Sequence, residues 1–361
     1  MKFPFVRPSF RDFAIATGVL ALSGVLCAQN AKNPIEVALL RWYQVNTAVQ
    51  LSTCSPPSVL GFDGKHIWVA CGNVSELHEY NSSDGSPIAA ITSVFVSGVL
   101  FSSLLYDGEN IWVSGNSNTA GFVTRINVST VNGDAACVAG GGGCNCTSLG
   151  NACASVSNVL SGAGGMTFDG ANVWVANGGA NNLSRITANA QPPIAATTVT
   201  LNSACNQPLF LAFDGTNVLV PCRNSNSVQF VTLTQQSLLT GITSPAWITY
   251  DGTDIWVTST NGTVYEVSPS GSGHIVSSAK GITGGAGGGS AYDGKYLWVA
   301  DYSTAMVTKL QLGGPITSSG SAPNITSMTA FSGGLTNPES PVFDGANVWF
   351  ANSGGTTVSK F

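Results

Sequence analysis

The sequence predicts an all-β protein, a seven-bladed β-propeller of four-stranded antiparallel blades. One phrase, typified by FDGANVWVAN, occurs seven times along the chain, always with Asp-Gly between two β-rich runs. Each copy is followed by polar residues and then by further β-capable runs. Such regular repetition of one structural unit indicates a repeat architecture. The copies begin at Phe62, Tyr106, Phe168, Phe213, Tyr250, Tyr292 and Phe343.

Each copy predicts a hairpin followed by two more strands. Asp-Gly joins the first two strands, because the glycine supplies the positive φ that a tight turn needs. The run after the turn, such as NVWVA, is apolar on both faces, as in a strand that is covered on each side. Third strands are predicted at 122–128, 183–187, 228–233 and 307–312, and an outer strand at 194–201.

Two residue types recur within the phrase for structural reasons. A tryptophan occupies one place in six copies, and Leu219 replaces it in the fourth. A tryptophan buries about 150–250 Å² of surface, so we expect these six to pack between adjacent blades. The aspartates that start the turns are explained by turn chemistry rather than by catalysis. The tryptophans are Trp68, Trp112, Trp174, Trp256, Trp298 and Trp349, and the aspartates are Asp63, Asp107, Asp169, Asp214, Asp251, Asp293 and Asp344.

The two ends of the sequence predict ring closure and export. One strand, 357–361, follows the seventh copy, so the last blade needs an outer strand, which we expect from the run 35–45. Residues 34–361 are therefore predicted to form a single propeller domain. Residues 1–28 combine basic residues, a short apolar run and Leu26-Cys27-Ala28, which predicts a secretory signal peptide and a secreted or periplasmic protein. Lipid attachment at Cys27 remains an open alternative.

The eight cysteines that follow Cys27 are expected to form disulfides. Two pairs flank the first and fourth copies with the same separation, Cys54 with Cys71 and Cys205 with Cys222, and a hairpin brings each pair to one rim of its blade. The other four lie in a Cys/Gly-rich insertion at about 131–158 and leave their connectivity open: Cys137, Cys144, Cys146 and Cys153. Four thiolates holding zinc is the alternative for this insertion.

Composition narrows the range of partners. The chain has 13 basic and 18 acidic residues, and the basic residues are scattered, which argues against a nucleic-acid surface. No run after the signal is long and apolar enough to span a membrane. We therefore expect a monomer that binds a protein, a glycan or a small molecule.

The glycine run 284–289 precedes an inner strand, where small residues suit the crowded centre of a ring.

With the repeat written out, the chain resembles the YVTN/NHL-like, streptogramin-lyase-like propellers of exported bacterial proteins. Their repeats often contain D-G-x-x-[IV]-W-V-[AT]-N followed by a strand such as NNLSRIT or TTVSKF, both of which occur here. The resemblance implies a seven-bladed ring. The lyase relatives use a histidine and acidic residues around a divalent metal, and the lactonase relatives hold a metal with Glu, Asn and Asp. No such set aligns with this chain.

Propeller ligands usually lie over the central channel, near the loops before the inner strands and after the second strands. Non-repeating polar residues in these loops are the candidate ligand-binding residues, because several polar groups converging on one pocket are typical of a binding site. We expect a binding or interaction scaffold without a required cofactor. The alternative is a metal-dependent lyase or lactonase with a divalent cation at the channel mouth. A cell-envelope adhesin is a third possibility. His66, His78 and His274 are assigned solvated or packing roles. The candidates are Asn177, Arg223, Asp301, Glu339 and Asn352.

Overall fold

The computed structural model describes residues 47–50, 54, 56–72, 74–92, 94, 100–116, 120–138, 143–159, 161–269, 273–282, 287–313 and 325–361. The predicted signal peptide 1–28, with Cys27, and the predicted strand 35–45 lie outside the described residues. Residues Ala48–Phe361 form one compact unit. No helix among the described residues has the length and apolar character needed to cross a membrane.

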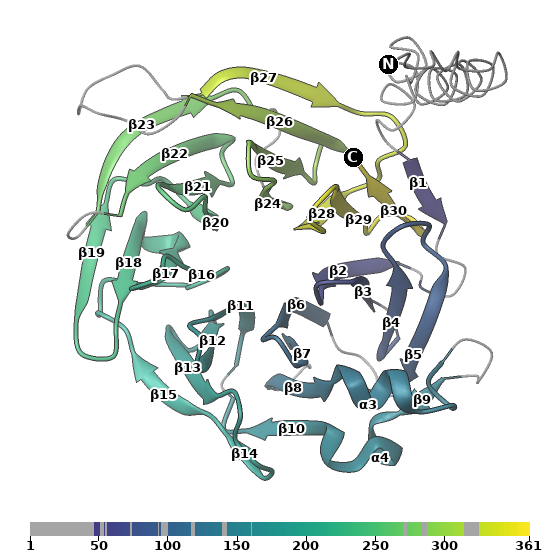
Figure 1. Ribbon diagram of the computed structural model, residues 1–361. Coiled ribbons are helices and arrows are strands. Elements are labelled where there is room, and N and C mark those ends of the chain that lie inside the picture. The colour runs from purple at the N-terminus through teal and green to yellow at the C-terminus, as the bar shows by residue number, and fades with distance from the viewer. Residues whose placement is uncertain are drawn as a thin grey trace, which may run out of the picture. The chain divides into compact units, whose positions relative to one another are not determined.

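The described residues of this unit form seven β-sheets arranged around a central axis (Figure 1). Four strands make up the core of each sheet, and consecutive strands of the chain are mostly neighbours in a sheet. The inner strands of adjacent sheets contact one another, and β2 (Pro57–Phe62) contacts both β6 (Leu100–Tyr106) and β28 (Pro338–Phe343). The ring is therefore closed, and the predicted seven-bladed β-propeller is confirmed.

The strands fall into four concentric sets. The other inner strands are β11 (Ala163–Phe168), β16 (Ala212–Phe213), β20 (Pro245–Tyr250) and β24 (Gly289–Tyr292). The second strands are β3 (His66–Cys71), β7 (Asn110–Asn116), β12 (Asn172–Asn177), β17 (Val218–Cys222), β21 (Ile255–Ser259), β25 (Tyr296–Asp301) and β29 (Val348–Asn352). The third strands are β4 (Glu76–Asn81), β8 (Gly121–Asn127), β13 (Asn182–Thr187), β18 (Ser227–Val231), β22 (Thr263–Ser268), β26 (Met306–Leu312) and β30 (Thr357–Lys360). The outer strands are β5 (Pro87–Thr92), β10 (Cys153–Ser157), β15 (Thr197–Thr200), β19 (Gln236–Thr240), β23 (His274–Lys280), β27 (Ile325–Phe331) and β1 (Thr47–Gln50).

Two details differ from the sequence predictions. An N-terminal strand does complete the last blade beside β30, but this strand is β1, which starts at Thr47, later than the predicted run 35–45. The predicted outer strand 194–201 is split in two. Its first part, β14 (Ile194–Ala195), pairs in parallel with β10 of the second blade, and only β15 belongs to the third blade.

The recurring tryptophan of the phrase builds the interfaces between blades. Each of the six indoles is at most 6% exposed. Trp174, for example, packs against Val218 and Val220 of the next blade, and Trp349 packs against Ile67 and Val69, which closes the ring. Burying one such side chain stabilises the fold by roughly 4–6 kcal/mol as an upper bound. Their predicted packing between adjacent blades is confirmed.

The turn aspartates are bonded to these tryptophans. In six blades, one carboxylate oxygen of the turn aspartate accepts a hydrogen bond from the indole Nε1 of the following strand, at 2.7–2.9 Å. In the third blade the other oxygen of Asp169 accepts from the backbone NH groups of Ala171 and Asn172, at 2.8 and 2.6 Å. Burial alone raises the pKa of Asp169, but its hydrogen bonds with Trp174, Asn172 and Ala171 outweigh burial and lower it.

The fourth blade shows the same turn without the indole. Leu219 takes the place of the tryptophan, and Oδ2 of Asp214 accepts from the Asn217 side chain at 3.0 Å. Asp169 accepts the equivalent bond from Asn172 at 3.1 Å in addition to the indole bond. The two turns therefore differ mainly by the bond of the indole, apart from a long contact of 3.4 Å between Asn172 Nδ2 and Oδ1 of Asp169.

All eight predicted disulfide cysteines are paired. Cys54 is bonded to Cys71 and Cys205 to Cys222, with Cα–Cα distances of 5.3 and 5.1 Å respectively. In the insertion the pairs are Cys137 with Cys144 and Cys146 with Cys153. This resolves the open connectivity, and because these sulfurs are paired they do not form the alternative zinc site.

The disulfide-linked insertion extends the outer edge of the first blade. It contains α3 (Val128–Gly133), β9 (Cys144–Asn145) and α4 (Cys146–Leu149). β9 runs parallel to β5 and forms a fifth strand of that sheet (Figure 1). α3 also contacts β5, so the insertion covers an edge that would otherwise be open.

We predict that Asp169→Asn destabilises the protein more than the matched change Asp214→Asn. Both variants keep an oxygen for the turn NH groups and lose a bond from the neighbouring asparagine, but only the first deprives an indole of its acceptor. The free energy of unfolding, measured by urea titration, should fall by about 1–3 kcal/mol more for Asp169→Asn. Equal losses in the two variants would contradict a stabilising role for the Asp–Trp hydrogen bond.

Candidate functional site

The inner strands surround two cavities along the central channel. The first, of about 330 Å³, is lined by residues near the ends of the inner strands, such as Phe62 and Tyr106. The second, of about 280 Å³, is lined by residues near their starts, such as Ala163 and Glu339. The second cavity thus opens toward the loops that were expected to surround a ligand. Four residues line both cavities and mark the boundary between them: Ser102, Phe210, Trp247 and Ser340.

An aromatic pair forms part of this boundary. The rings of Phe210 and Trp247 are stacked, with centroids 3.6 Å apart and planes inclined by 30°. Glycines on neighbouring inner strands leave room for them. A Cβ at Gly165 would collide with Phe210, and a Cβ at Gly289 would lie 3.0 Å from the Trp247 ring. The expectation that small residues suit the ring centre is confirmed at Gly289, and the space they leave is filled by these two aromatic side chains.

Glu339 is the predicted residue that reaches the cavity. It lies on β28 and lines the second cavity, where it is the sole charged side chain among the described lining residues. Burial raises the pKa of Glu339 to about 7, although a hydrogen bond with Ser353 opposes this shift. Glu339 therefore changes its charge near neutral pH, inside a cavity whose other described lining residues are uncharged.

Three other predicted residues lie at the ends of second strands, on the same face as this cavity. Asn177 is fully buried and donates to Asn182 and Ser184 at 2.9 Å. Asn352 is equally buried and donates to Thr357 and Ser359 at 2.9 Å. Both amides thus join the second strand of a blade to its third strand.

Asp301 and Arg223 complete the predicted set. Asp301 is fully buried and accepts from Ser303 Oγ at 3.1 Å and from the Thr304 backbone at 3.2 Å. Arg223 is exposed at the start of the 3-10 turn η2 (Arg223–Ser225), and its backbone NH donates to Gln207 at 3.1 Å. The structure therefore does not gather the five residues at one point, and ligand binding by them stays a prediction.

The aromatic pair was missed from the sequence, although a signal was present. Phe210 and Trp247 stand three residues before the repeat aromatics Phe213 and Tyr250. At the same place most other copies have a small residue: Ser103, Gly165, Gly289 and Ser340. A departure from the repeat at a position that faces the ring centre is what marks these two side chains.

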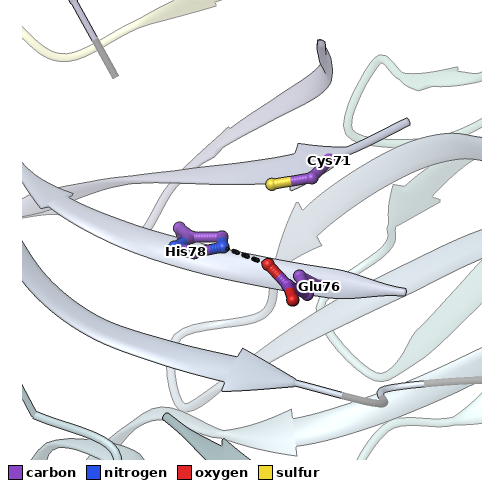
Figure 2. Close-up of side chains that lie close together, drawn as sticks. All are labelled: Cys71, Glu76 and His78. Carbon is purple, nitrogen blue, oxygen red and sulfur yellow. Dashed lines mark hydrogen bonds and ion pairs between the residues drawn. The ribbon is translucent and has the colours of Figure 1, made fainter. Parts of the chain in front are cut away.

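Two groups of potential metal ligands lie in the first blade, away from the channel cavities. Figure 2 shows Cys71, Glu76 and His78, in which His78 Nε2 lies 2.9 Å from a Glu76 oxygen. The sulfur of Cys71 is bonded to Cys54, so it is not a thiolate ligand in the oxidised protein. This group therefore joins a histidine and a glutamate at the rim of the blade without offering a third free ligand.

The second group comprises Asp63, His66 and Glu79, beside the first Asp-Gly turn. His66 begins β3, at the end of the blade opposite to the second cavity, as predicted. Burial raises the pKa of Glu79 to about 7; Asp63 adds to this shift, whereas Asn132 and Lys65 oppose it. His66 faces a buried carboxylate here and its side chain is 12% exposed, so of the two roles expected from the sequence the packing role describes it.

Comparison with known proteins places the chain by its fold. No family model and no curated protein sequence matches it. Among solved structures it is similar to a catalytically inactive variant of virginiamycin B lyase from Staphylococcus aureus with quinupristin, at 17% identity and a TM-score of 0.65, covering 87% of this chain and 98% of that one.

Other solved structures are similar to it as well. A chain of the mitotic checkpoint complex aligns at 11% identity and a TM-score of 0.66, covering 87% of this chain and 94% of that one. The Cps50 (Swd1) propeller domain of Myceliophteria thermophila aligns at 7% identity and a TM-score of 0.62, covering 88% and 99%. The predicted resemblance to the streptogramin-lyase-like seven-bladed propellers is thus confirmed at the level of fold.

Proposed function

We propose that this chain is an exported binding module that holds a small ligand in the second cavity, at the mouth of the central channel. The observation that carries the proposal is the combination of one half-buried carboxyl, Glu339, with the stacked Phe210–Trp247 pair at the same cavity. A concave, mostly apolar pocket with few polar groups is the usual form of a small-molecule site.

The chemistry of the cavity selects the ligand class. Glu339 can accept a hydrogen bond or balance a positive charge when ionised, and the aromatic faces favour an apolar ring or a cation. A small molecule with an apolar ring and an amine or hydroxyl group fits both features. Anionic ligands are disfavoured, because Glu339 is the sole charged side chain in the described lining.

The remaining predicted residues take supporting roles in this proposal. Arg223 has an exposed side chain, so it would contact a part of the ligand that projects beyond the cavity. Asn177, Asp301 and Asn352 would hold the surrounding loops through the bonds described above. Export is supported by four disulfides, which form and persist in oxidising compartments.

A metal-dependent lyase or lactonase is the second candidate, favoured by the similarity to virginiamycin B lyase. Such an enzyme would need a divalent cation in the cavity, held by more than one side chain. The described lining offers the Glu339 carboxylate and no histidine, which supports the binding module.

A thermal-shift screen with amines, sugars and lactones, repeated with Mg²⁺ and with a chelator, separates the two candidates. Chelator-resistant ligand binding supports the module, and turnover of a lactone that requires Mg²⁺ supports the enzyme.

We predict that Trp247→Leu weakens binding of the ligand found in this screen by about tenfold or more, because one face of the aromatic pair is lost. The matched control is Trp298→Leu, which removes an indole buried between blades and lowers stability while leaving the cavity lining intact. Isothermal titration calorimetry on both variants measures the dissociation constants. Unchanged affinity in Trp247→Leu would place the ligand elsewhere.

Glu339 should also leave a signature in the pH dependence of stability. Its pKa is higher in the folded than in the unfolded chain, so the folded state binds its proton more tightly. The stability it contributes is therefore present at acidic pH and is lost as pH rises from about 4.5 to about 7. The free energy of unfolding should be measured for wild type and for Glu339→Gln at several pH values. The difference between the two proteins should change between about pH 4.5 and about pH 7. A difference that stays constant across this range would contradict the raised pKa of Glu339.

A further inference from the structure

We propose that the first blade contains a binding site for a divalent transition-metal cation, formed by Asp63, His66 and Glu79. The site lies beside the first Asp-Gly turn, at the opposite end of the blade from the loops around the second cavity. It is independent of the proposed ligand cavity. Two positions of the first blade differ from the equivalent positions of most other blades.

Four blades place a basic residue opposite the repeat tryptophan, on the third strand. Its charged group lies over the indole, with distances to the ring centroid from 4.8 to 6.0 Å. In the first blade the residue paired with Trp68 at this place is Glu79. The first blade thus has a second carboxylate beside its turn aspartate, at the place where four other blades have a positive charge. The four basic residues are Arg125, Arg185, Lys309 and Lys360.

A second position in the first blade departs from the repeat at the same time. The third residue after the turn aspartate is asparagine in four blades, and its side chain donates to that aspartate. In the first blade this residue is His66, which offers a ring nitrogen toward the carboxylates. Both departures replace a hydrogen-bond donor or a cation by a residue type that ligates metals. The four asparagines are Asn110, Asn172, Asn217 and Asn347.

The three side chains converge. Nδ1 of His66 lies 2.6 Å from Oε1 of Glu79 and 3.5 Å from Oδ2 of Asp63. Donor atoms around one tetrahedral zinc ion lie roughly 3.3 Å apart, which these two distances bracket. The side chains of Glu79, Asp63 and His66 are 0%, 4% and 12% exposed, so the site is enclosed except at the histidine.

Two atoms of this group that could ligate a metal have no hydrogen-bond partner. Oε2 of Glu79 is buried without one. Nδ1 of His66 also makes no hydrogen bond, although it lies 2.6 Å from Oε1 of Glu79 as an ion-pair contact. A buried carboxylate oxygen without a partner is costly, and a bound cation would satisfy both atoms.

The insertion offers a fourth residue that could ligate the cation, Asn132. Asn132, in α3, donates from Nδ2 to Oε1 of Glu79 at 3.2 Å, while its own Oδ1 is buried and has no partner. Rotation of the amide by half a turn would place Oδ1 where Nδ2 now lies and turn it toward the cation. The insertion pinned by two disulfides would thereby close the site from outside the ring.

The donor set indicates the kind of metal. One imidazole nitrogen with two carboxylates suits Zn²⁺ or a similar transition metal, whereas Mg²⁺ and Ca²⁺ prefer oxygen ligands alone. The fifth blade is the best comparison. It has Asp254 at the position of His66 and Glu266 at the position of Glu79, and so has no histidine at either position. Those side chains do not form a three-ligand group among the described residues.

The test uses the purified full chain and Zn²⁺. After loading and dialysis, elemental analysis should find about one Zn²⁺ per wild-type chain, and calorimetry should give its affinity. Glu79→Gln should weaken binding by about 10- to 100-fold. The double variant His66→Asn with Glu79→Arg restores the pair found in the second and third blades, so it should fold and bind no Zn²⁺. A Zn²⁺-dependent rise in Tm, present in wild type and lost in His66→Asn alone, gives a second readout.

Three matched variants locate the ion. Glu266→Gln tests the equivalent place in the fifth blade, His78→Gln tests the other group of the first blade, and Glu339→Gln tests the channel. All three should keep Zn²⁺ binding. The proposal is overturned if wild type binds no Zn²⁺, if the double variant retains it, or if one of these three changes removes it.

Discussion

The aspartate of each Asp-Gly turn is bonded to three partners at once in six of the seven blades that the structure describes. One oxygen accepts the two backbone NH groups that the tight turn leaves free, and the other accepts the indole Nε1 of the next strand. The turn is thereby fixed relative to the side chain that fills the space between blades. Because the indole packs on the following blade, a local turn also sets the position of a long-range interface.

Much of the fold could be predicted because the repeat encodes it. In phrases such as the one at Phe168, the Asp-Gly dipeptide indicates a turn, the apolar run indicates a covered second strand, and the tryptophan indicates an interface between blades. The seven copies of the phrase determine the number of blades. The spacing of Cys54 with Cys71 also led directly to a disulfide. The Asp–Trp hydrogen bond was not predicted, since the aspartate and the tryptophan were explained separately. Strand β1 was placed too early in the chain, because a single β-capable run carries no register signal of its own.

The site was harder to predict, because it depends on departures from the repeat. Glu339 was identified as a non-repeating residue, and it does line the second cavity. Asn177 and Asn352 were chosen by the same criterion, yet their amides bond within their own blades, which spacing alone does not reveal. Phe210 and Trp247 escaped notice since an aromatic residue in a β-rich run looks like ordinary core. The same kind of departure distinguishes the first blade, at His66 and Glu79.

The Asp–Trp hydrogen bond links each turn to an interface between blades, and hydrogen exchange of the indole Nε1–H groups tests this link most directly. In NMR spectra of ¹⁵N-labelled protein, the bonded indoles should exchange only through global unfolding, many times more slowly than Trp247, which lines the channel. Exchange of these indoles as fast as that of Trp247 would contradict a stable hydrogen bond between turn and indole. The bonded indoles are those of Trp68, Trp112, Trp174, Trp256, Trp298 and Trp349.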